Sequence, residues 1–347
     1  MLFRSYVLCL FIMYKQVLGL FVLGIVLISV SYYGKGEESV SLSLIAYKVN
    51  RNRNATWKAT REVYKSLVMD RPRFGLIDDE EGDLGVSQPP VHNGPVPESF
   101  DARVAWPGCP SFLDIYDQSN CASCWAIAAT SSMSDRICIQ SDQKDTRRLS
   151  AEDLLECCKS CGYGCYGGTL MGGWRYWKKH GIVTGGPYNN KSYCKPYIFE
   201  PCNHANYGPY APCEAIPPNT PTCRKECENG YKTEYRKDRV FGESFYKLVG
   251  EEAIKAEIVN NGSVQAGMSV FEDLLVYKSG VYQHLEGNFI GGHAVKIIGY
   301  GIEKGVKYWL IANSWNDTWG ENGFFKILRG EDHCGIENGV VAGLPIQ

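Results

Sequence analysis

The sequence predicts an α+β protein with two unlike halves, the first mainly helical and the second mainly of β-strands, and a cleft between them. Small and apolar residues recur at helical spacing between Ser123 and His180. From Val264 onward, short apolar runs typical of strands take over. The third observation is a count of 15 cysteines in 347 residues, which indicates a disulfide-bonded protein from an oxidising compartment.

Length and composition agree with about two domains, since a domain takes roughly 100 to 200 residues. Hydrophobic residues make up 44%, aromatic residues 12% and charged residues 21%, which excludes a disordered, collagen-like or coiled-coil chain. The formal net charge is -2, and no Lys/Arg-rich run is present. We therefore expect no nucleic-acid partner.

The first 33 residues predict a signal peptide. The apolar run Val17–Val30 follows the positive Lys15, and small residues come after it. A membrane anchor is the alternative, because about 20 apolar residues span a bilayer, but Lys15 interrupts the run. Met13 offers an alternative start to Met1. We expect a chain that enters the secretory pathway, without stable membrane insertion once the signal is removed.

In a secreted chain, Asn-x-Ser/Thr triplets are candidate glycan acceptors. The sequence has four of them, at Asn54, Asn190, Asn261 and Asn316.

Residues 34–95 read as a detachable, inhibitory pro-segment. Their composition is charged and polar, with one mixed stretch, Trp57–Met69, that predicts an amphipathic helix. The acidic run Asp78–Asp83 and the stretch Gln88–Pro90 predict a flexible linker. The alternative is a poorly ordered N-terminal arm.

Three helices are expected next. Ser123–Ile139 has small and apolar residues at helical spacing and no Gly or Pro, so it predicts a buried helix. Ser150 caps a second helix whose first turn is acidic, and Leu170–His180 predicts a third. Residues 184–240 form a long loop region tied by cysteines. The expected strands are 264–270, 294–301, 308–313 and 323–330.

Cys124 and His293 are the first candidate catalytic residues. Cys124 begins the apolar helix, where the helix N-terminus favours the reactive thiolate. His293, in a Gly-Gly-His-Ala-Val segment that enters a strand, can take the thiol proton and leave a nucleophilic ion pair. Alternatively, Cys124 is half of a disulfide and His293 is structural.

Two amides complete the candidate site. Asn313 can hold the second ring nitrogen of His293, with Trp315 and Trp319 shielding that contact. Gln118, six residues before Cys124, can help the Cys124 backbone N–H bind a developing oxyanion.

The Cys, His, Asn order resembles that of papain-like proteases, and residues 96–347 resemble a cathepsin B-like cysteine protease. The matching motifs are Ser99–Arg103 at the mature start, Gly164–Gly168 in the cleft and Asp332–Glu337 near the C-terminus. The insertion Cys194–Cys227 resembles the occluding loop of the cathepsin B branch, and it explains why His293 lies 169 residues after Cys124.

The resemblance implies a papain-like two-domain fold, with a mainly helical half over about 107–245, including the occluding loop, and a mainly β half over 246–343. It implies substrate contacts at Gly167, Gly168, Gly292, Trp319, His204 and Gly339. It also implies that protein or peptide substrates and the chain's own pro-segment occupy the cleft, with no cofactor and no metal.

The resemblance further implies six disulfides. They are Cys109–Cys138, Cys121–Cys165, Cys157–Cys223, Cys158–Cys161, Cys194–Cys227 and Cys202–Cys213. Since Cys9 leaves with the signal peptide, only Cys124 and Cys334 stay free. The residues alone leave a zinc site open for the cluster Cys157, Cys158, Cys161 and Cys165.

The sequence departs from the family in the occluding loop. Where the family has two adjacent histidines that hold a substrate's C-terminal carboxylate, this chain has His204 and Ala205. His204 is expected to pair with Asp117, whereas a second Arg–Asp latch of the family falls on Tyr210 and Thr318. With fewer contacts the loop should open more easily, which predicts weaker dipeptidyl-carboxypeptidase activity and relatively stronger endopeptidase activity.

Two further departures lie in the cleft. Gly339 stands where the family has an acid in the pocket for the residue two before the cleaved bond, so apolar side chains should be preferred over Arg. Ala122 replaces a glycine, and its methyl group is expected to crowd the cleft.

These features predict a cysteine peptidase made as a zymogen, lysosomal or extracellular. The stretch Tyr308–Glu321 resembles gut proteases of blood-feeding worms, although Thr318 departs from them, so a gut lumen is among the expected locations. The alternatives are a catalytically inactive papain-shaped binding protein and a membrane-anchored interaction protein.

Overall fold

The computed structural model describes residues 41–60, 74–77, 86–92, 94–204, 209–213 and 218–346. The predicted signal peptide, the acidic linker run and Ala205 lie outside the described residues. Among the residues that are described, no helix is both long enough and apolar enough to cross a membrane.

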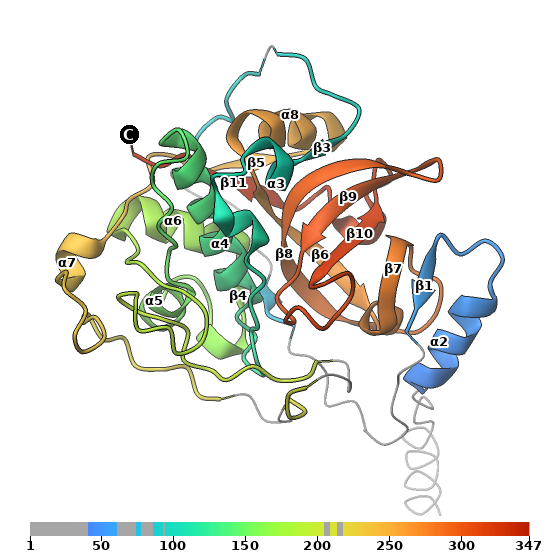
Figure 1. The fold of residues 1–347 in the computed structure, drawn as a ribbon, viewed down its shortest axis with the longest axis horizontal. Helices are drawn as coiled ribbons and strands as arrows, with labels where there is room; N and C mark the ends of the chain where they lie inside the picture. Colours follow the sequence, from blue (N-terminus) through green and yellow to red (C-terminus); the bar gives the residue numbers. More distant parts are fainter. Residues whose placement is uncertain are drawn as a thin grey trace, which may run out of the picture. The chain divides into compact units, whose positions relative to one another are not determined.

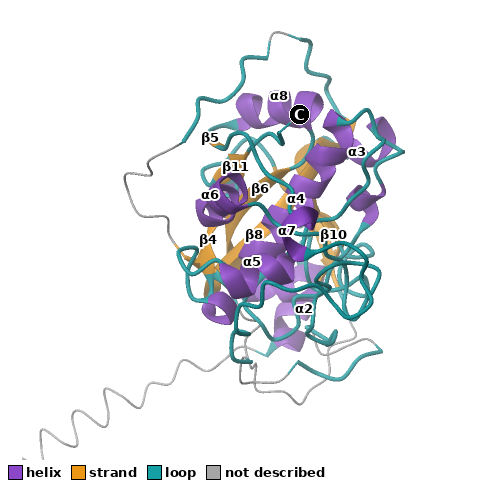
Figure 2. Cartoon of the chain, turned by 90° about the vertical axis from the view of Figure 1, so that its left-hand side faces the viewer, coloured by secondary structure: helices purple, strands orange, loops and turns teal. Residues whose placement is uncertain are grey.

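The mainly helical half is built around α4 (Cys124–Gln140), α5 (Ala151–Cys157) and α6 (Leu170–His180), which lie close to the predicted ranges. Helix α4 is buried without a break from Cys124 to Cys138, because its small side chains let neighbouring elements approach on every face. It packs against α5 and α6 on one side and against the sheet on the other (Figure 2). Helix α4 therefore forms the wall between the two halves.

The β half is one large sheet. Its strand order is β1-β7-β10-β9-β8-β6-β11-β5, with β3 paired to β8 outside this path, and the β10–β7 pair is the parallel one. The strands are β1 (Trp57–Ala59), β3 (Phe100–Asp101), β5 (Tyr246–Leu248), β6 (Val264–Phe271), β7 (Tyr277–Tyr282), β8 (Phe289–Glu303), β9 (Val306–Ala312), β10 (Phe324–Leu328) and β11 (Val340–Ala342). The four predicted strands correspond to β6, β8, β9 and β10, so the α+β class with two unlike halves is confirmed.

Several short elements complete the described fold. They are α2 (Leu42–Arg51), α3 (Ala102–Ala105), α7 (Tyr235–Asp238), α8 (Glu251–Asn261), the two-residue strands β2 (Leu76–Ile77) and β4 (Gly168–Thr169), and 3-10 turns at Pro110–Leu113, Gly164–Tyr166, Glu272–Val276 and His333–Gly335. Helix α8 lies beside β5 and β11 in Figure 1.

The predicted helix Trp57–Met69 is wrong in its described part. Trp57–Ala59 form strand β1, which pairs antiparallel with β7 at the sheet edge. The Trp57 ring packs against Tyr277 and Tyr282, with centroids 6.0 and 5.2 Å apart, so cross-strand aromatic contacts outweigh local helix propensity. Residues 61–69 lie outside the described residues. The helix described within the predicted pro-segment is instead α2, whose buried Leu42, Ile45, Ala46 and Val49 share one face.

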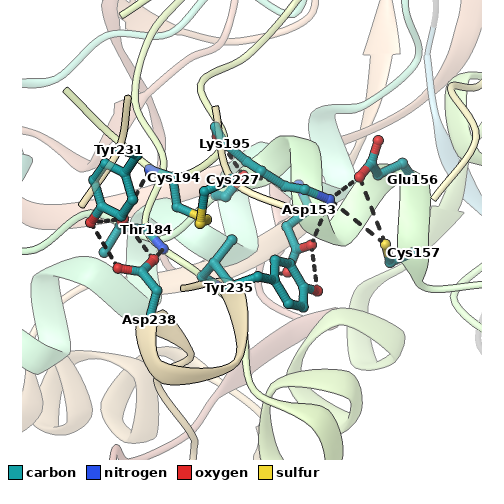
Figure 3. The surroundings of a disulfide bond; sticks show 12 residues. Asp153, Glu156, Cys157, Thr184, Cys194, Lys195, Cys227, Tyr231, Tyr235 and Asp238 are labelled. Carbon is teal, nitrogen blue, oxygen red and sulfur yellow. Dashed lines mark hydrogen bonds and ion pairs between the residues drawn. A yellow bond between two sulfur atoms is a disulfide. The ribbon is translucent and has the colours of Figure 1, made fainter. Parts of the chain in front are cut away.

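The described residues contain six disulfides, and they are the six pairs that the resemblance implied. All four cysteines weighed as zinc ligands are in these bonds, and Cys124 and Cys334 carry free thiols. Figure 3 shows the base of the insertion, where Cys194–Cys227 lies beside the buried Lys195. The Lys195 Nζ donates to Asp153 at 3.1 Å and to Glu156, both on α5. The ends of the insertion are thus fixed to the helical half.

Candidate active site

Cys124 is the first residue of α4, and its side chain is fully buried. The preceding Ser123 hydroxyl bonds to the Tyr197 hydroxyl at 2.6 Å, and Tyr197 donates in turn to the Gln118 carbonyl at 2.9 Å. These bonds fix the segment before the helix. As a result the Cys124 sulfur has a defined position at the start of the helix.

His293 lies on β8, with its Nε2 2.9 Å from Asn313 Oδ1. The Ser314 backbone N–H also donates to this oxygen at 2.9 Å, which fixes the orientation of the amide. Since Oδ1 only accepts, His293 Nε2 carries the proton and Nδ1 is the basic nitrogen. His293 Nδ1 is buried and makes no hydrogen bond in the described structure. The imidazole is therefore in the tautomer that can accept a thiol proton.

Aromatic rings cover the His293–Asn313 contact. The Trp315 ring stacks on the His293 ring, with centroids 5.0 Å apart and an interplanar angle of 25°. The edge of Trp319 packs on Trp315 at 4.9 Å, and Trp319 lies in the core behind it. The two indoles thus exclude water from the hydrogen bond that orients the imidazole, as the sequence predicted.

Gln118 is fully buried beside the nucleophile. Its Oε1 accepts from the Ser314 hydroxyl at 2.8 Å, and its Nε2 donates to the Cys121 carbonyl at 3.2 Å. The amide is therefore held from both sides, and its nitrogen faces the Cys121–Cys124 turn. The residue predicted as an oxyanion donor is thus fixed in position by two hydrogen bonds.

Burial sets the protonation of the pair in this structure. It raises the pKa of the Cys124 thiol, although backbone hydrogen bonds from Ala294 and Gly75 act in the opposite direction. Burial also lowers the pKa of His293 to about 4, against the stabilising bond to Asn313. Both shifts favour the neutral forms, so the thiolate–imidazolium pair is suppressed while the site is covered.

The cover is the segment Phe74–Ile77, which belongs to the predicted pro-segment. Strand β2 pairs parallel with β4, Leu76 beside Gly168 and Ile77 beside Thr169, and Gly168 N–H donates to the Gly75 carbonyl at 2.8 Å. A Cβ on Gly75 would lie 2.0 Å from the Ala122 carbonyl oxygen, so only glycine fits here. Ala122, a departure noted in the sequence, therefore faces the pro-segment.

The ends of this segment occupy two different subsites. Phe74 lies against Gly291 and within 6.2 Å of the His293 and Trp315 rings, centroid to centroid. Leu76 lies beside Gly292 and lines a cavity of about 680 Å³. The segment thus runs, from N- to C-terminus, from the side of His293 to the cavity.

The same cavity contains Gly339, where the sequence predicted a pocket without an acid. Leu170, Met268 and Cys334 also line it, and the nearest atoms to a Cβ on Gly339 would be 3.4 Å away, at Leu170. Lys247 and Ser269 line it as well, and neither contribution could be found from the sequence. Apolar side chains therefore share this lining with polar groups, one of them a cation.

The occluding loop is held to the site by His204. Its Nε2 lies 2.7 Å from Asp117 Oδ1, both side chains are nearly buried, and its ring stacks over Trp315. Asp117 Oδ2 accepts from Asn316 Nδ2 at 2.9 Å and from the Cys202 backbone N–H at 3.1 Å. Asn316, noted in the sequence only as a glycan acceptor, thus belongs to this latch.

The second latch position has no charged partner. Tyr210 is 39% exposed, and its backbone carbonyl accepts from the Asn203 amide. Thr318 instead bonds to Asn316 Oδ1 through its backbone N–H at 3.0 Å and through its hydroxyl. The two side chains provide no ion pair between loop and domain.

The four glycan-acceptor triplets differ in exposure. Asn54 is exposed and Asn190 half-buried. Asn261 and Asn316 are buried, and their Nδ2 atoms donate to Glu257 and Asp117. In the described residues, candidate groups of metal-binding atoms occur at Cys202, His204 and Cys213, and at Asp153, Glu156 and Cys157. The three cysteines in them are in disulfides.

Comparison with known proteins gives consistent matches. A family model described as papain family cysteine protease matches residues 96–344. A cathepsin B-like cysteine proteinase of Schistosoma japonicum is 44% identical over 313 residues, covering 88% of this chain and 91% of the relative. The cathepsin B-like cysteine proteinase 6 of Caenorhabditis elegans is 46% identical over 314 residues, covering 87% and 82%.

Solved structures extend this match to the proform. Procathepsin B S9 from Trypanosoma congolense has a TM-score of 0.73 and 34% identity, with 87% of this chain and 97% of that chain covered. A digestive procathepsin L 3 of Tenebrio molitor has a TM-score of 0.58 at 22% identity, which shows the fold alone. Both structures contain a pro-segment.

Proposed function

The chain belongs to the papain family of cysteine proteases, and from that premise we propose that Cys124 is its nucleophile and residues 34–95 its removable inhibitory pro-segment. It is a cathepsin B-like cysteine protease made as a zymogen. The observation that carries the assignment of roles is the hydrogen bond from His293 Nε2 to Asn313 Oδ1, which leaves Nδ1 as the base.

In the mechanism, Cys124 loses its proton to His293 Nδ1 and attacks the peptide carbonyl. The Gln118 amide and the Cys124 backbone N–H bind the oxyanion. His293 then protonates the leaving amine, and water hydrolyses the thioester. Asn313 acts as a positioning residue that keeps the imidazole in one tautomer while its proton count changes.

The pro-segment inhibits because it crosses the cleft in the opposite direction to a substrate. A substrate enters with the residue two before the cleaved bond in the Gly339 cavity, and its leaving amine lies toward His293. Phe74–Ile77 run from His293 to that cavity, N to C, so no peptide carbonyl meets Cys124 in the orientation for attack. The cover also removes water, which keeps both catalytic groups neutral.

Substrate preference follows from the Gly339 cavity. Leu76 lines it together with Leu170 and Met268, and the described lining contains no carboxylate. An Arg side chain would find no carboxylate at Gly339 and would meet the like charge of Lys247. We expect Phe or Leu to be preferred over Arg two residues before the cleaved bond.

The balance of activities follows from the occluding loop. The described loop is latched through His204 to Asp117, and the Tyr210 and Thr318 positions add no ion pair. A single latch opens more readily than two, which admits longer chains. We therefore propose an endopeptidase with weakened dipeptidyl-carboxypeptidase activity, in a lysosomal or extracellular compartment.

The test uses the processed chain with two substrates, an internally quenched peptide and a peptide with a free C-terminal dipeptide. A Cys124→Ala chain is the control for both. The double variant Tyr210→Arg and Thr318→Asp restores the ion pair between loop and domain. It should raise the rate of dipeptide release relative to internal cleavage. If the ratio of the two rates does not change, the proposed role of the loop is wrong, while loss of both rates in Cys124→Ala still supports the peptidase.

A further inference from the structure

The segment that joins the pro-segment to the peptidase domain follows the domain surface. The Ser87 backbone N–H donates to the Phe245 carbonyl at 2.8 Å, and the Tyr300 hydroxyl donates to the Pro97 carbonyl at 3.0 Å. Phe100 then pairs with Tyr300 as strand β3 joins β8. Between these contacts, His92 provides a side-chain anchor.

The His92 imidazole enters a socket on α8. Its Nε2 lies 2.8 Å from Glu257 Oε2 and 3.4 Å from Asn261 Nδ2. The Glu257 side chain has no exposed surface, and the His92 side chain is 13% exposed. A residue of the pro-segment thus reaches a carboxylate that is buried in the peptidase domain. None of these residues lines the cavity beside Cys124.

Glu257 has partners within the peptidase domain besides His92. Arg136 of α4 bonds to Glu257 Oε1 at 2.8 Å, and the Tyr246 hydroxyl donates to the same oxygen at 2.7 Å. Burial alone would raise the pKa of Glu257, but Arg136 and the hydrogen bonds, including that from His92, hold it below its usual value. The carboxylate is therefore ionised, and Oε2 is the atom that His92 occupies. Removing His92 leaves no unpaired buried charge, because Arg136 stays in place.

We propose that this Glu257 socket is a second binding site for the pro-segment, separate from the cleft, and that His92 bound in it protects the bonds between His92 and Val96 from cleavage. The proposal rests on the proposed removal of residues 34–95. Cleavage before Ser87 then comes first and frees the cleft, and trimming to Val96 follows as a slower step.

Protection follows from the geometry of the two tethers. A protease binds its substrate as an extended chain, and about six extended residues span roughly 20 Å. His92 and Pro97 are both bound to the domain, and only four residues lie between them. A protease that cuts there must first pull His92 from Glu257 or Pro97 from Tyr300. The cost of releasing His92 is therefore added to the barrier for this cleavage and not to that for a cleavage before Ser87, the preceding tether.

The test uses the full chain with Cys124→Ala as substrate and a trace of processed wild-type enzyme, followed by intact mass over time. We expect an intermediate that starts before His92 and retains it. His92→Ala should shorten the lifetime of this intermediate about tenfold, as expected for loss of a hydrogen bond to a charged group, and leave the first cleavage unchanged. Val91→Ala is the matched control, because the Val91 side chain is 84% exposed.

Two further arms separate the possible outcomes. Synthetic peptides spanning residues 88–99, with and without His92→Ala, should be cut at equal rates, which excludes direct recognition of residue 92. Glu257→Gln should shorten the lifetime of the same intermediate, although the sequence of the junction is unchanged. A parallel digestion with proteinase K measures the lifetime of the same intermediate without relying on the chain's own activity. If the processed wild-type enzyme cuts nothing, that result counts against the proposed peptidase function and not against the socket. Equal lifetimes for the wild-type and His92→Ala junctions in both digestions would overturn the proposal.

Discussion

Replacing Gly75 by alanine should open the cleft of the intact zymogen. Gly75 is the point at which the pro-segment passes the nucleophile, and its carbonyl accepts a hydrogen bond from Gly168 N–H at 2.8 Å. A Cβ here would lie 2.0 Å from the Ala122 carbonyl oxygen and 2.7 Å from its carbonyl carbon. These are backbone atoms that no rotamer change can move. The pro-segment must therefore shift out of the cleft, and its bond to Gly168 is lost.

The size of the effect combines two costs. Overpacking in a close contact costs about 1–3 kcal/mol. The lost backbone hydrogen bond adds about 1 kcal/mol. Together, about 2–4 kcal/mol shifts the equilibrium between covered and open clefts by about 30- to 900-fold.

The assay is the rate at which iodoacetamide alkylates Cys124 in the uncut full chain, followed by peptide mass mapping. Cys334, the other free thiol in the described residues, is mapped separately, because it lines the same cavity as Leu76. Gly75→Ala should raise the Cys124 rate by the factor above. The matched control is Gly94→Ala, whose Cβ would meet nothing within 4 Å. If Gly75→Ala is alkylated at the wild-type rate, the described path of the pro-segment across Cys124 is not the inhibitory contact.

Three other outcomes are expected. Gly339→Glu should raise kcat/KM for Arg relative to Phe two residues before the cleaved bond by at least about tenfold, measured with paired fluorogenic dipeptides, because it supplies the missing counter-charge. The proform should lose folding stability as the pH falls from 6.5 toward about 4, because the unfolded state binds a proton that buried His293 rejects; thermal unfolding of His293→Gln should show a smaller loss over this window. Glycopeptide mass spectrometry should find no glycan at Asn261 or Asn316, because both amides are buried and already donate.

The residues proposed as catalytic could be selected from the sequence because each lies in a local pattern with its own physical meaning. Cys124 begins an apolar helix, His293 enters a strand after two glycines, and Asn313 ends the next strand. In the structure Cys124 is the first residue of α4 as predicted, whereas β8 begins earlier, at Phe289, so that His293 lies within the strand, and β9 ends at Ala312, one residue before Asn313. The neighbouring strands β8 and β9 then bring His293 and Asn313 together, which the sequence alone could not specify without the resemblance.

Contacts between distant segments could not be predicted. Trp57 has a helix-compatible neighbourhood, yet it is held in a strand by Tyr277 and Tyr282, more than 200 residues away in the sequence. The socket for His92 likewise depends on Glu257 and Arg136, which belong to different helices. The local sequence does not indicate such pairs, because neither residue of a pair has an unusual neighbourhood and the contact exists only in the folded chain.

The most direct test of the account is to locate the covalent adduct of an irreversible peptidyl vinyl sulfone on the processed chain and to follow peptidase activity in the same sample. Two free thiols compete in the described residues, Cys124 and Cys334. If Cys124 is the nucleophile, one adduct per chain forms, on Cys124, and activity falls in proportion to it. An adduct on Cys334, or full activity in a chain with Cys124 completely modified, would contradict it.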